Sequence, residues 1–192
     1  MAISKIVTNS VDSGVTLTSP VINTITSAAA TALTLQSAGT TAVTISTSQY
    51  VTYANNPAFN ASLNGSNQSV TSGSTVTLTF GTANYNRGSA YNATTYTFTA
   101  PVAGLYQFNA RARVDGIAGG GGNYALLILN TTAQTYNSIC SASGSYNNIN
   151  ISVSTYMAAG HTASVALNSS GQTVNAVNTQ PVYSDFSGFL IG

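Results

Sequence analysis

Residues 96–108 read YTFTAPVAGLYQF, and the chain continues as NARARVDG to residue 116. Side chains of a β-strand point alternately to its two faces, so residues two apart lie on the same side of the sheet. One face of this stretch then carries Tyr106, Phe108, Ala110, Ala112 and Val114, and the other carries Gln107, Asn109, Arg111, Arg113 and Asp115. The pattern predicts a strand whose aromatic side is packed and whose opposite side is polar.

The overall composition combines very few charges with many apolar residues. The 192 residues include four Lys and Arg, three Asp, one His and no Glu, while 43% are hydrophobic. A chain this apolar is expected to pack rather than stay disordered. Its net charge of +1 gives no field to attract nucleic acid. No stretch approaches the ~18 apolar residues of a membrane span, so we expect neither a nucleic-acid partner nor a membrane span.

The chain divides by composition into two regions, 1–56 and 57–192. The first is rich in Thr, Ser, Ala and Val and has no aromatic residue before Tyr50, whereas the second holds nearly all of the Tyr and Phe residues. We therefore predict an N-terminal arm or stalk over 1–56 and a head domain over 57–192. Domains of about 100–200 residues are common, so the head is long enough for a core of its own.

The arm contains three short alternating stretches. They are GVTLT at 14–18, ALTLQ at 32–36 and AVTIS at 42–46, and small-residue turns separate them. The pattern predicts short β-strands. Residues 15–51 contain only ten Val, Leu and Ile residues, too few to offset the entropy lost on ordering the segment. The arm is thus expected to gain order by packing on sister chains or on a larger assembly; the alternative is a flexible Ser/Thr-rich leader.

The head is predicted to be all-β. Alternating runs occur at about 8–12-residue spacing, between clusters of Gly, Asn, Ser and Pro, and no window shows a helical period. This spacing favours a β-sandwich or jelly roll over an α/β fold. The runs are 74–80, 94–98, 105–114, 124–130, 148–157, 161–168 and 185–191.

Residues 80–108, FGTANYNRGSAYNATTYTFTAPVAGLYQF, resemble the signature of the complement C1q globular-head family, which belongs with the tumour-necrosis-factor-like jelly rolls. The positions at the signature spacing are Phe80, Asn86, Tyr91, Phe98, Gly104, Tyr106 and Phe108. FSGFLI at 186–191 resembles the closing strand of the family, PAFNASL at 57–63 its first strand, and MAAGHTASVAL at 157–167 a late strand pair. The resemblance thus spans about 57–192.

The resemblance implies a ten-stranded jelly roll that forms a parallel homotrimer and binds partners without catalysis. Core or trimer packing is then expected from Phe80, Tyr91, Phe98, Tyr106, Phe108, Phe186 and Phe189. The sequence departs from the family at Ala110, where an aromatic residue is usual, and at His161, where an acidic residue is common. The second departure puts an inherited calcium site in doubt. Residues 32–49 of the arm also resemble segments of tailed-phage fibre and virion-surface proteins.

Residue types for catalysis or metal binding are scarce. His161 is the only conventional base, and Asp12, Asp115 and Asp185 are scattered along the chain without any Glu to pair with. Glycosidases need two carboxylates that flank one bond, and zinc sites need clustered Cys and His. We therefore predict no enzymatic activity, no cofactor and no metal site.

Binding through exposed side chains is the more plausible chemistry. Tyrosine and asparagine offer flat apolar faces and hydrogen-bonding edges that suit sugars. The candidates in loop-like sequence are Tyr85, Asn86, Tyr91, Tyr136 and Tyr146, to which Arg111 and Arg113 add a pair of cations on one strand face. The alternative for each tyrosine is a core or trimer contact. For the arginines it is an ion pair with Asp115 or Asp185, across a subunit contact or exposed.

These observations lead to a functional hypothesis. The chain is interpreted as a homotrimeric structural protein of a phage virion surface, attached to capsid or tail proteins by its arm. The head would decorate the particle or adhere to host surface glycans, as a capsid-decorating head fibre or a short tail fibre. The alternative is a free secreted or cell-surface lectin-like module.

Overall fold

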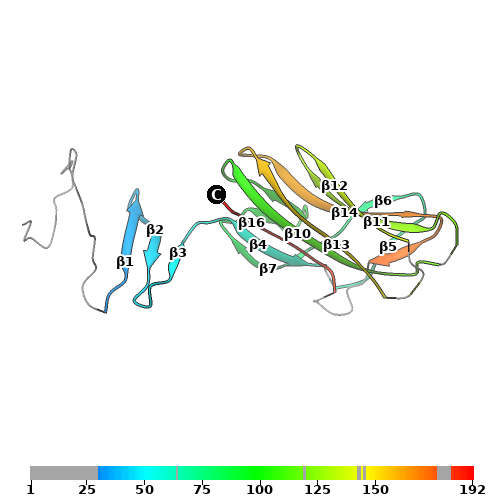
Figure 1. The fold of residues 1–192 in the computed structure, drawn as a ribbon, viewed down its shortest axis with the longest axis horizontal. Coiled ribbons are helices and arrows are strands. Elements are labelled where there is room, and N and C mark those ends of the chain that lie inside the picture. Colours follow the sequence, from blue (N-terminus) through cyan, green and yellow to red (C-terminus); the bar gives the residue numbers. More distant parts are fainter. Residues whose placement is uncertain (1–29, 64, 119, 142–143, 145, 177–182) are drawn as a thin grey trace, which may run out of the picture. The chain divides into compact units, whose positions relative to one another are not determined.

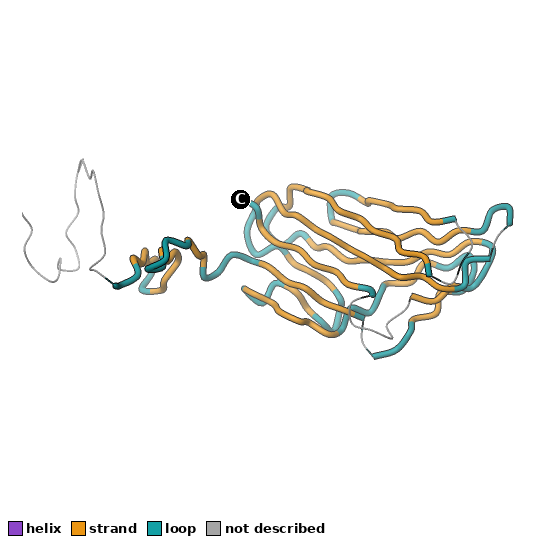
Figure 2. The backbone as a smooth tube through the Cα atoms, turned by 60° about the horizontal axis from the view of Figure 1, so that its bottom comes forward, coloured by secondary structure: helices purple, strands orange, loops and turns teal. Residues whose placement is uncertain are grey.

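The computed structural model describes residues 30–63, 65–118, 120–141, 144, 146–176 and 183–192. These residues form strands, turns and loops and contain no helix (Figure 2), so the expected all-β class is confirmed. Accordingly, no helix of the described residues is long and apolar enough to cross a membrane. The predicted strand at 14–18 lies outside the described residues. The chain separates into two compact units, Met1–Ala54 and Asn55–Gly192, which we call the arm and the head.

The described part of the arm is a three-stranded antiparallel sheet in the order β1-β2-β3 (Figure 1). Its strands are β1 (Leu33–Ser37), β2 (Thr40–Ile45) and β3 (Val51–Tyr53). β1 and β2 are joined by Ala38 and Gly39, both with positive φ (50° and 75°). Two such residues form the tight hairpin turn whose twist matches that of the flanking strands. Two of these strands were predicted, and β3 was not.

The head contains a seven-stranded sheet built around one long strand, β10 (Gly104–Asp115). β10 pairs along nearly its whole length with β13 (Asn147–Met157) on one edge. On its other edge it pairs first with β16 and then with β15. The remaining strands follow outward on that side. They are β15 (Val174–Ala176) with β5 (Gln68–Val70), and β16 (Asp185–Leu190) with β4 (Ala58–Ser62) and β7 (Thr82–Arg87).

A six-stranded sheet forms the other layer of the head (Figure 1). Its order is β12-β11-β14-β9-β8, and β6 also pairs with β14. The strands are β12 (Thr135–Cys140), β11 (Tyr124–Thr131), β14 (Thr162–Ser170), β9 (Thr97–Thr99), β8 (Tyr91–Asn92) and β6 (Thr75–Thr77). The described head therefore carries thirteen strands, β4 to β16, rather than ten. The excess arises because the sheet margins are broken into pieces of two or three residues.

The core between the two sheets is centred on stacked aromatic rings. The Phe59 ring stacks on Tyr91 with centroids 4.6 Å apart and on Phe98 at 5.2 Å, and it meets Phe186 edge-on at 4.9 Å. Tyr106 and Phe108 extend the cluster through Phe98. Offset and edge-on pairs of this kind add about 0.5–1.5 kcal/mol beyond the burial of their area.

The residues expected to pack divide into two groups. Phe80, Tyr91, Phe98, Tyr106, Phe108 and Phe186 are buried in the core. Phe189 is exposed on the surface of the single chain, so it is no core residue and its role in a trimer contact stays a prediction. Along β10 every second residue is buried, beginning at Gly104 and ending at Val114. The two-residue step of the aromatics thus fills the inner side of a sheet, as the alternation predicted.

Gly188 in the closing strand β16 allows the aromatic rings to approach the backbone. It pairs with Phe108 on one side and with Phe59 on the other. A Cβ atom at this position would lie 2.5 Å from Cδ1 of Phe108 and 2.9 Å from Cε1 of Phe59. Both distances are far below van der Waals contact, so the ring packing requires a residue without a side chain here.

Candidate binding surface on the outer face of the seven-stranded sheet

The outer face of the seven-stranded sheet is the side that points away from the aromatic core. Its centre is formed by the polar residues of β10 and by the residues of β13, β16 and β4 that pair with them. Residues directly opposite each other in antiparallel strands share a face. The side chains on this surface therefore form rows that run across several strands. Along the strands, the rows change from apolar at one end to charged in the middle.

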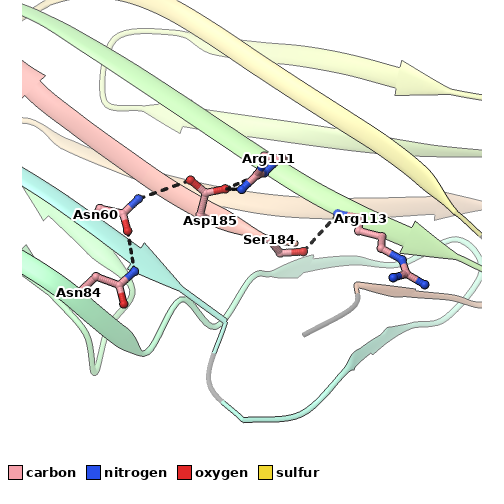
Figure 3. A network of polar contacts seen from close by, with 6 residues as sticks. All are labelled: Asn60, Asn84, Arg111, Arg113, Ser184 and Asp185. Carbon is pink, nitrogen blue, oxygen red and sulfur yellow. Dashed lines mark hydrogen bonds and ion pairs between the residues drawn. The ribbon is translucent and has the colours of Figure 1, made fainter. Parts of the chain in front are cut away.

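The charged middle of the outer face is a chain of polar contacts across four strands (Figure 3). Arg111 on β10 pairs with Asp185 on β16, with Nη2 to Oδ1 at 2.7 Å and Nε to Oδ1 at 2.8 Å. The second carboxylate oxygen of Asp185 accepts a hydrogen bond from Asn60 Nδ2 at 3.4 Å. Asn84 Nδ2 on β7 donates to Asn60 Oδ1 at 2.6 Å. The pairing of Arg111 with Asp185 thus lies within one subunit.

A hollow of about 300 Å³ opens beside this chain of contacts. It is lined by Asn109, Ala110, Arg111, Asn150, Ile151, Ser152 and Asp185. The hollow presents amide groups, a hydroxyl group and one ion pair, so it suits a polar ligand or the polar side chains of another subunit.

Hydroxyl and amide groups form a ladder between β10 and β13 next to the hollow. Ser154 Oγ donates to Gln107 Oε1 at 2.6 Å, and Ser152 Oγ donates to Asn109 Oδ1 at 2.8 Å. Gln107 Nε2 donates to Ser152 Oγ at 3.0 Å. These side chains satisfy one another, which fixes their rotamers and keeps this part of the face flat.

Arg113 is held more tightly than Arg111. Its Nε and Nη2 atoms donate to the two carboxylate oxygens of Asp115 at 3.2 and 3.0 Å. Its guanidinium carbon lies 4.3 Å from the ring centroid of Tyr146 and 4.6 Å from that of Tyr183. The hydrogen bonds to Asp115 raise the pKa of Arg113 above its usual range. Arg113 is thus a permanent cation that is already engaged by a carboxylate and two rings.

The other end of the outer face is apolar. Leu105 pairs with Tyr156 on β13, and its carbonyl oxygen accepts a hydrogen bond from the Ile191 N–H at 2.8 Å. Phe189, which pairs with Gln107, lies in the next row. All four side chains are exposed, Tyr156 to 63%. We call Leu105, Tyr156, Phe189 and Ile191 the apolar end. Such a cluster on a soluble domain commonly marks a contact with another protein.

The tyrosines predicted in loops lie mostly in strands. Tyr85 is an exposed residue of β7, and Tyr136 is a half-buried residue of β12 that packs on the core. Tyr91 belongs to β8 and is buried, with its hydroxyl donating to the Phe80 carbonyl oxygen at 2.8 Å. Burial, with a smaller contribution from nearby Tyr96, raises the pKa of Tyr91 above the ordinary range for tyrosine. Tyr146 lies outside the named strands and is strongly exposed.

Asn86 supports the fold next to Tyr91. Its amide nitrogen donates to the Tyr91 carbonyl oxygen at 2.7 Å, and its amide oxygen accepts from the Tyr91 N–H at 3.1 Å. The side chain thereby replaces a rung of backbone pairing between β7 and β8. This bridging contact explains why the signature stretch has an asparagine at this position.

Among the described residues, His161, Asp115 and Asp185 form no common cluster, and Asp12 lies outside the described residues. His161 lies between β13 and β14, and its Nδ1 atom has no hydrogen-bond partner among the described residues. Asp115 and Asp185 are engaged by the two arginines. Within the described ranges, no group of three or more His, Cys, Asp or Glu residues could hold a metal ion.

Several residues of the outer face were not predicted from the sequence. The apolar end was missed apart from Phe189, and so were Asn60, Asn84 and Tyr183. A signal existed for Leu105 and Tyr156, because each places a large apolar side chain on the polar side of an alternating strand. The contacts of Asn60 and Asn84 depend on pairing between strands far apart in sequence, which carries no local signal.

Comparisons with known proteins connect this architecture with a family. Residues 58–191 match the family model described as the C1q domain. The globular domain of the zebrafish complement 1qA protein is similar in structure, with a TM-score of 0.50 and 17% identity over 71% of this chain and 98% of that chain. The comparison with curated proteins finds no match.

Two further solved structures have the same fold. Murine APRIL, crystallised at pH 8.5, gives a TM-score of 0.52 and 9% identity over 70% of this chain and 98% of its own. Eiger TNF from S. frugiperda gives a TM-score of 0.50 and 10% identity over 71% of this chain and 94% of its own. The expected C1q/TNF-like jelly roll is therefore confirmed. The resemblance of the arm to phage proteins stays a prediction.

Proposed function

Because the chain belongs to the C1q domain family over residues 58–191, we propose that it is a non-enzymatic binding module that works as a homotrimer on the surface of a phage virion. C1q- and TNF-like domains are generally binding modules, and they typically form homotrimers. Within this proposal the arm attaches the trimer to capsid or tail proteins. The head is displayed outward as a capsid-decorating head fibre or short tail fibre.

The main observation in support of the proposed trimer is the apolar end of the outer face. Leu105, Tyr156, Phe189 and Ile191 expose large apolar side chains side by side, although the core of the head is complete without them. Their burial against sister chains would contribute roughly 25 cal/mol for each Å² removed from water. The satisfied polar ladder and ion pair in the rest of the face add little repulsion, because their charges are already paired.

Adhesion to host glycans is the second element of the proposal. Tyr146 supports it, because its exposed ring and the neighbouring Arg113 offer a flat apolar surface beside a cation. Tyr85 offers a similar exposed ring on β7. Aromatic rings with polar neighbours are suited to stacking against the apolar face of a sugar.

The trimer is tested by the solution mass of the full chain and of two matched variants. We expect three copies for the unmodified chain. Leu105→Asp puts a charge into the apolar end and should give single subunits at micromolar concentration, because three carboxylates would be buried together. Ile139→Asp is the control, since Ile139 is an exposed apolar residue of the other sheet. A single-subunit mass for the unmodified chain would overturn the proposal.

The virion role is tested by deleting residues 1–54 and imaging phage particles incubated with the product. Attachment by the arm predicts a trimeric head that no longer joins particles. Ligand binding that is unchanged by the deletion, together with no particle bound by the full chain, would instead support the free lectin-like module. Glycan adhesion is measured separately, with Tyr146→Ala expected to weaken binding by up to about tenfold, the loss of about one stacking contact.

A further inference from the structure

The arm sheet has one face with a continuous apolar cluster. Leu33 pairs with Ile45, which pairs with Val51, and Leu35 pairs with Val43, which pairs with Tyr53. Directly paired residues share a face, and residues two apart share it as well. These six residues therefore form one continuous surface, which we call the arm face. Between them Thr34 pairs with Thr44 and Thr44 with Thr52, so the opposite side carries a row of three threonines.

Nothing within the described arm covers the arm face. None of the residues 30–54 is buried, and the side chains of Leu35, Val51 and Tyr53 are 50%, 51% and 56% exposed. The apolar face of a sheet is buried against another element in stable folds. The arm face is therefore expected to pack against another surface.

We infer that the arm face packs against the same face of two other copies of this chain, so that three arms form a stalk with an apolar axis. Residues 30–54 contain no charged side chain. Two copies of a surface with a net charge repel each other, and here that repulsion does not arise. A row of threonine would then form the outside of the stalk and face water. This inference rests on the trimer proposed above for the number of copies.

The small size of the arm face explains why the head is needed. Three strands at 4.8 Å spacing and two side-chain rows give an area on the order of 200 Å². Stable interfaces between free proteins bury about 800 Å² per partner. Free arms would therefore stay apart. Arms that are tied to one trimeric head meet at an effective concentration of about millimolar, which lets a weak contact form.

Two cysteine variants of the full chain distinguish the faces. Val43 lies at the centre of the arm face, and the next residue, Thr44, lies at the centre of the threonine side. Cys140 is replaced by Ser in both, because it is the only native cysteine. After mild oxidation with copper phenanthroline, Val43→Cys should give covalent dimers in about tenfold larger yield than Thr44→Cys, since only the former brings thiols together at the axis.

The outcomes separate this inference from the proposed function. A trimeric mass with linked Val43→Cys and unlinked Thr44→Cys supports the stalk. A trimeric mass with equal yields, or with no link at either position, overturns the stalk and leaves the trimeric head standing. A single-subunit mass overturns both. A link from position 43 to a different virion protein on particles would assign the arm face to that protein and overturn the inference.

A second measurement does not depend on disulfide geometry. Leu35→Thr, Val43→Thr and Ile45→Thr combined keep strand-forming residues in place but remove the apolar surface. Proteolysis within the arm should then be about tenfold faster, because an unpacked sheet opens readily. The matched control carries Thr34→Ser, Thr44→Ser and Thr52→Ser on the opposite side. Equal rates for the two triple variants would overturn the inference.

Discussion

The arm and the head are both built from strands with alternating apolar and polar residues, but they differ in how far the apolar side chains are buried. Leu35 in β1 and Phe59 in β4 both lie on an apolar face of an antiparallel sheet. Phe59 is fully buried beneath a second sheet, whereas half of the Leu35 side chain remains exposed. Alternation of apolar and polar residues is therefore sufficient to specify strands, but a core needs a second layer.

The two units differ for a reason that is visible in their composition. The head has two layers and large rings to place between them, with Phe59 in contact with both Phe98 and Phe186. The described part of the arm, residues 30–54, has one layer, and its apolar residues are mainly aliphatic. The head is accordingly expected to fold by itself, and the arm only when it packs against other chains. Substitutions can test this contrast.

The largest expected effect comes from removing the central ring of the head. Phe59→Ala should lower the free energy of unfolding by about 3–5 kcal/mol, because it leaves a cavity among three aromatic neighbours. Leu35→Ala in the arm should leave the head transition within about 0.5 kcal/mol. Denaturant unfolding followed by near-ultraviolet circular dichroism reports on the rings of the head. Comparable losses for the two variants would mean that arm and head form one cooperative unit.

The sequence predicted the strands whose alternation is strong. The two faces of β10 could be assigned from its residues alone. Its apolar side chains had to be buried, and its polar side chains therefore had to lie on the opposite face. β7 was missed because all six of its residues are exposed and it has no apolar alternation. It is a strand because its backbone pairs with β4, which is a property of the tertiary structure.

The candidate surface could be predicted only in part. Arg111 and Arg113 were identified from their strand face, with Asp115 and Asp185 as possible partners. Which arginine meets which carboxylate depends on the register between β10 and β16, strands that lie 74 residues apart at the Arg111–Asp185 contact. The position of Tyr183 over Arg113 is likewise a nonlocal contact. The row of Leu105 and Tyr156 depends on the register between β10 and β13.

Alkaline pH should test the burial of Tyr91 in the head. Tyr91 is buried, while Tyr50 and Tyr53 of the arm are exposed. The pKa of Tyr91 is raised in the folded head, first by burial. Its contribution to stability is complete below the unfolded value of about 10 and is lost as pH rises toward the folded value. The free energy of unfolding of the head should therefore fall above pH ~10. Tyr91 contributes up to one proton to this dependence, which corresponds to about 1.4 kcal/mol per pH unit.

Tyr91→Phe sharpens the test of this alkaline dependence. At neutral pH the variant should lose about 1 kcal/mol, because the Phe80 carbonyl oxygen loses its buried donor. Above pH ~10 its stability should fall less steeply than that of the unmodified chain. Tyr53→Phe is the matched control in the arm. Urea unfolding at pH 7 and at several values above 10 measures both slopes, and identical slopes for all three chains would contradict the assignment to Tyr91.

The smallest expected effect is that of the ion pair on the outer face. Asp185→Asn should cost the isolated head less than about 1 kcal/mol, and less still in high salt, because Arg111 is largely exposed. Arg111→Gln and the double variant complete a thermodynamic cycle that isolates the pair. The arm, which has no charge over 30–54, should not respond to salt. A coupling above about 3 kcal/mol would require the pair to be removed from water. Within the single head it faces solvent, so a coupling of that size would mean that neighbouring subunits cover the charged middle as well as the apolar end.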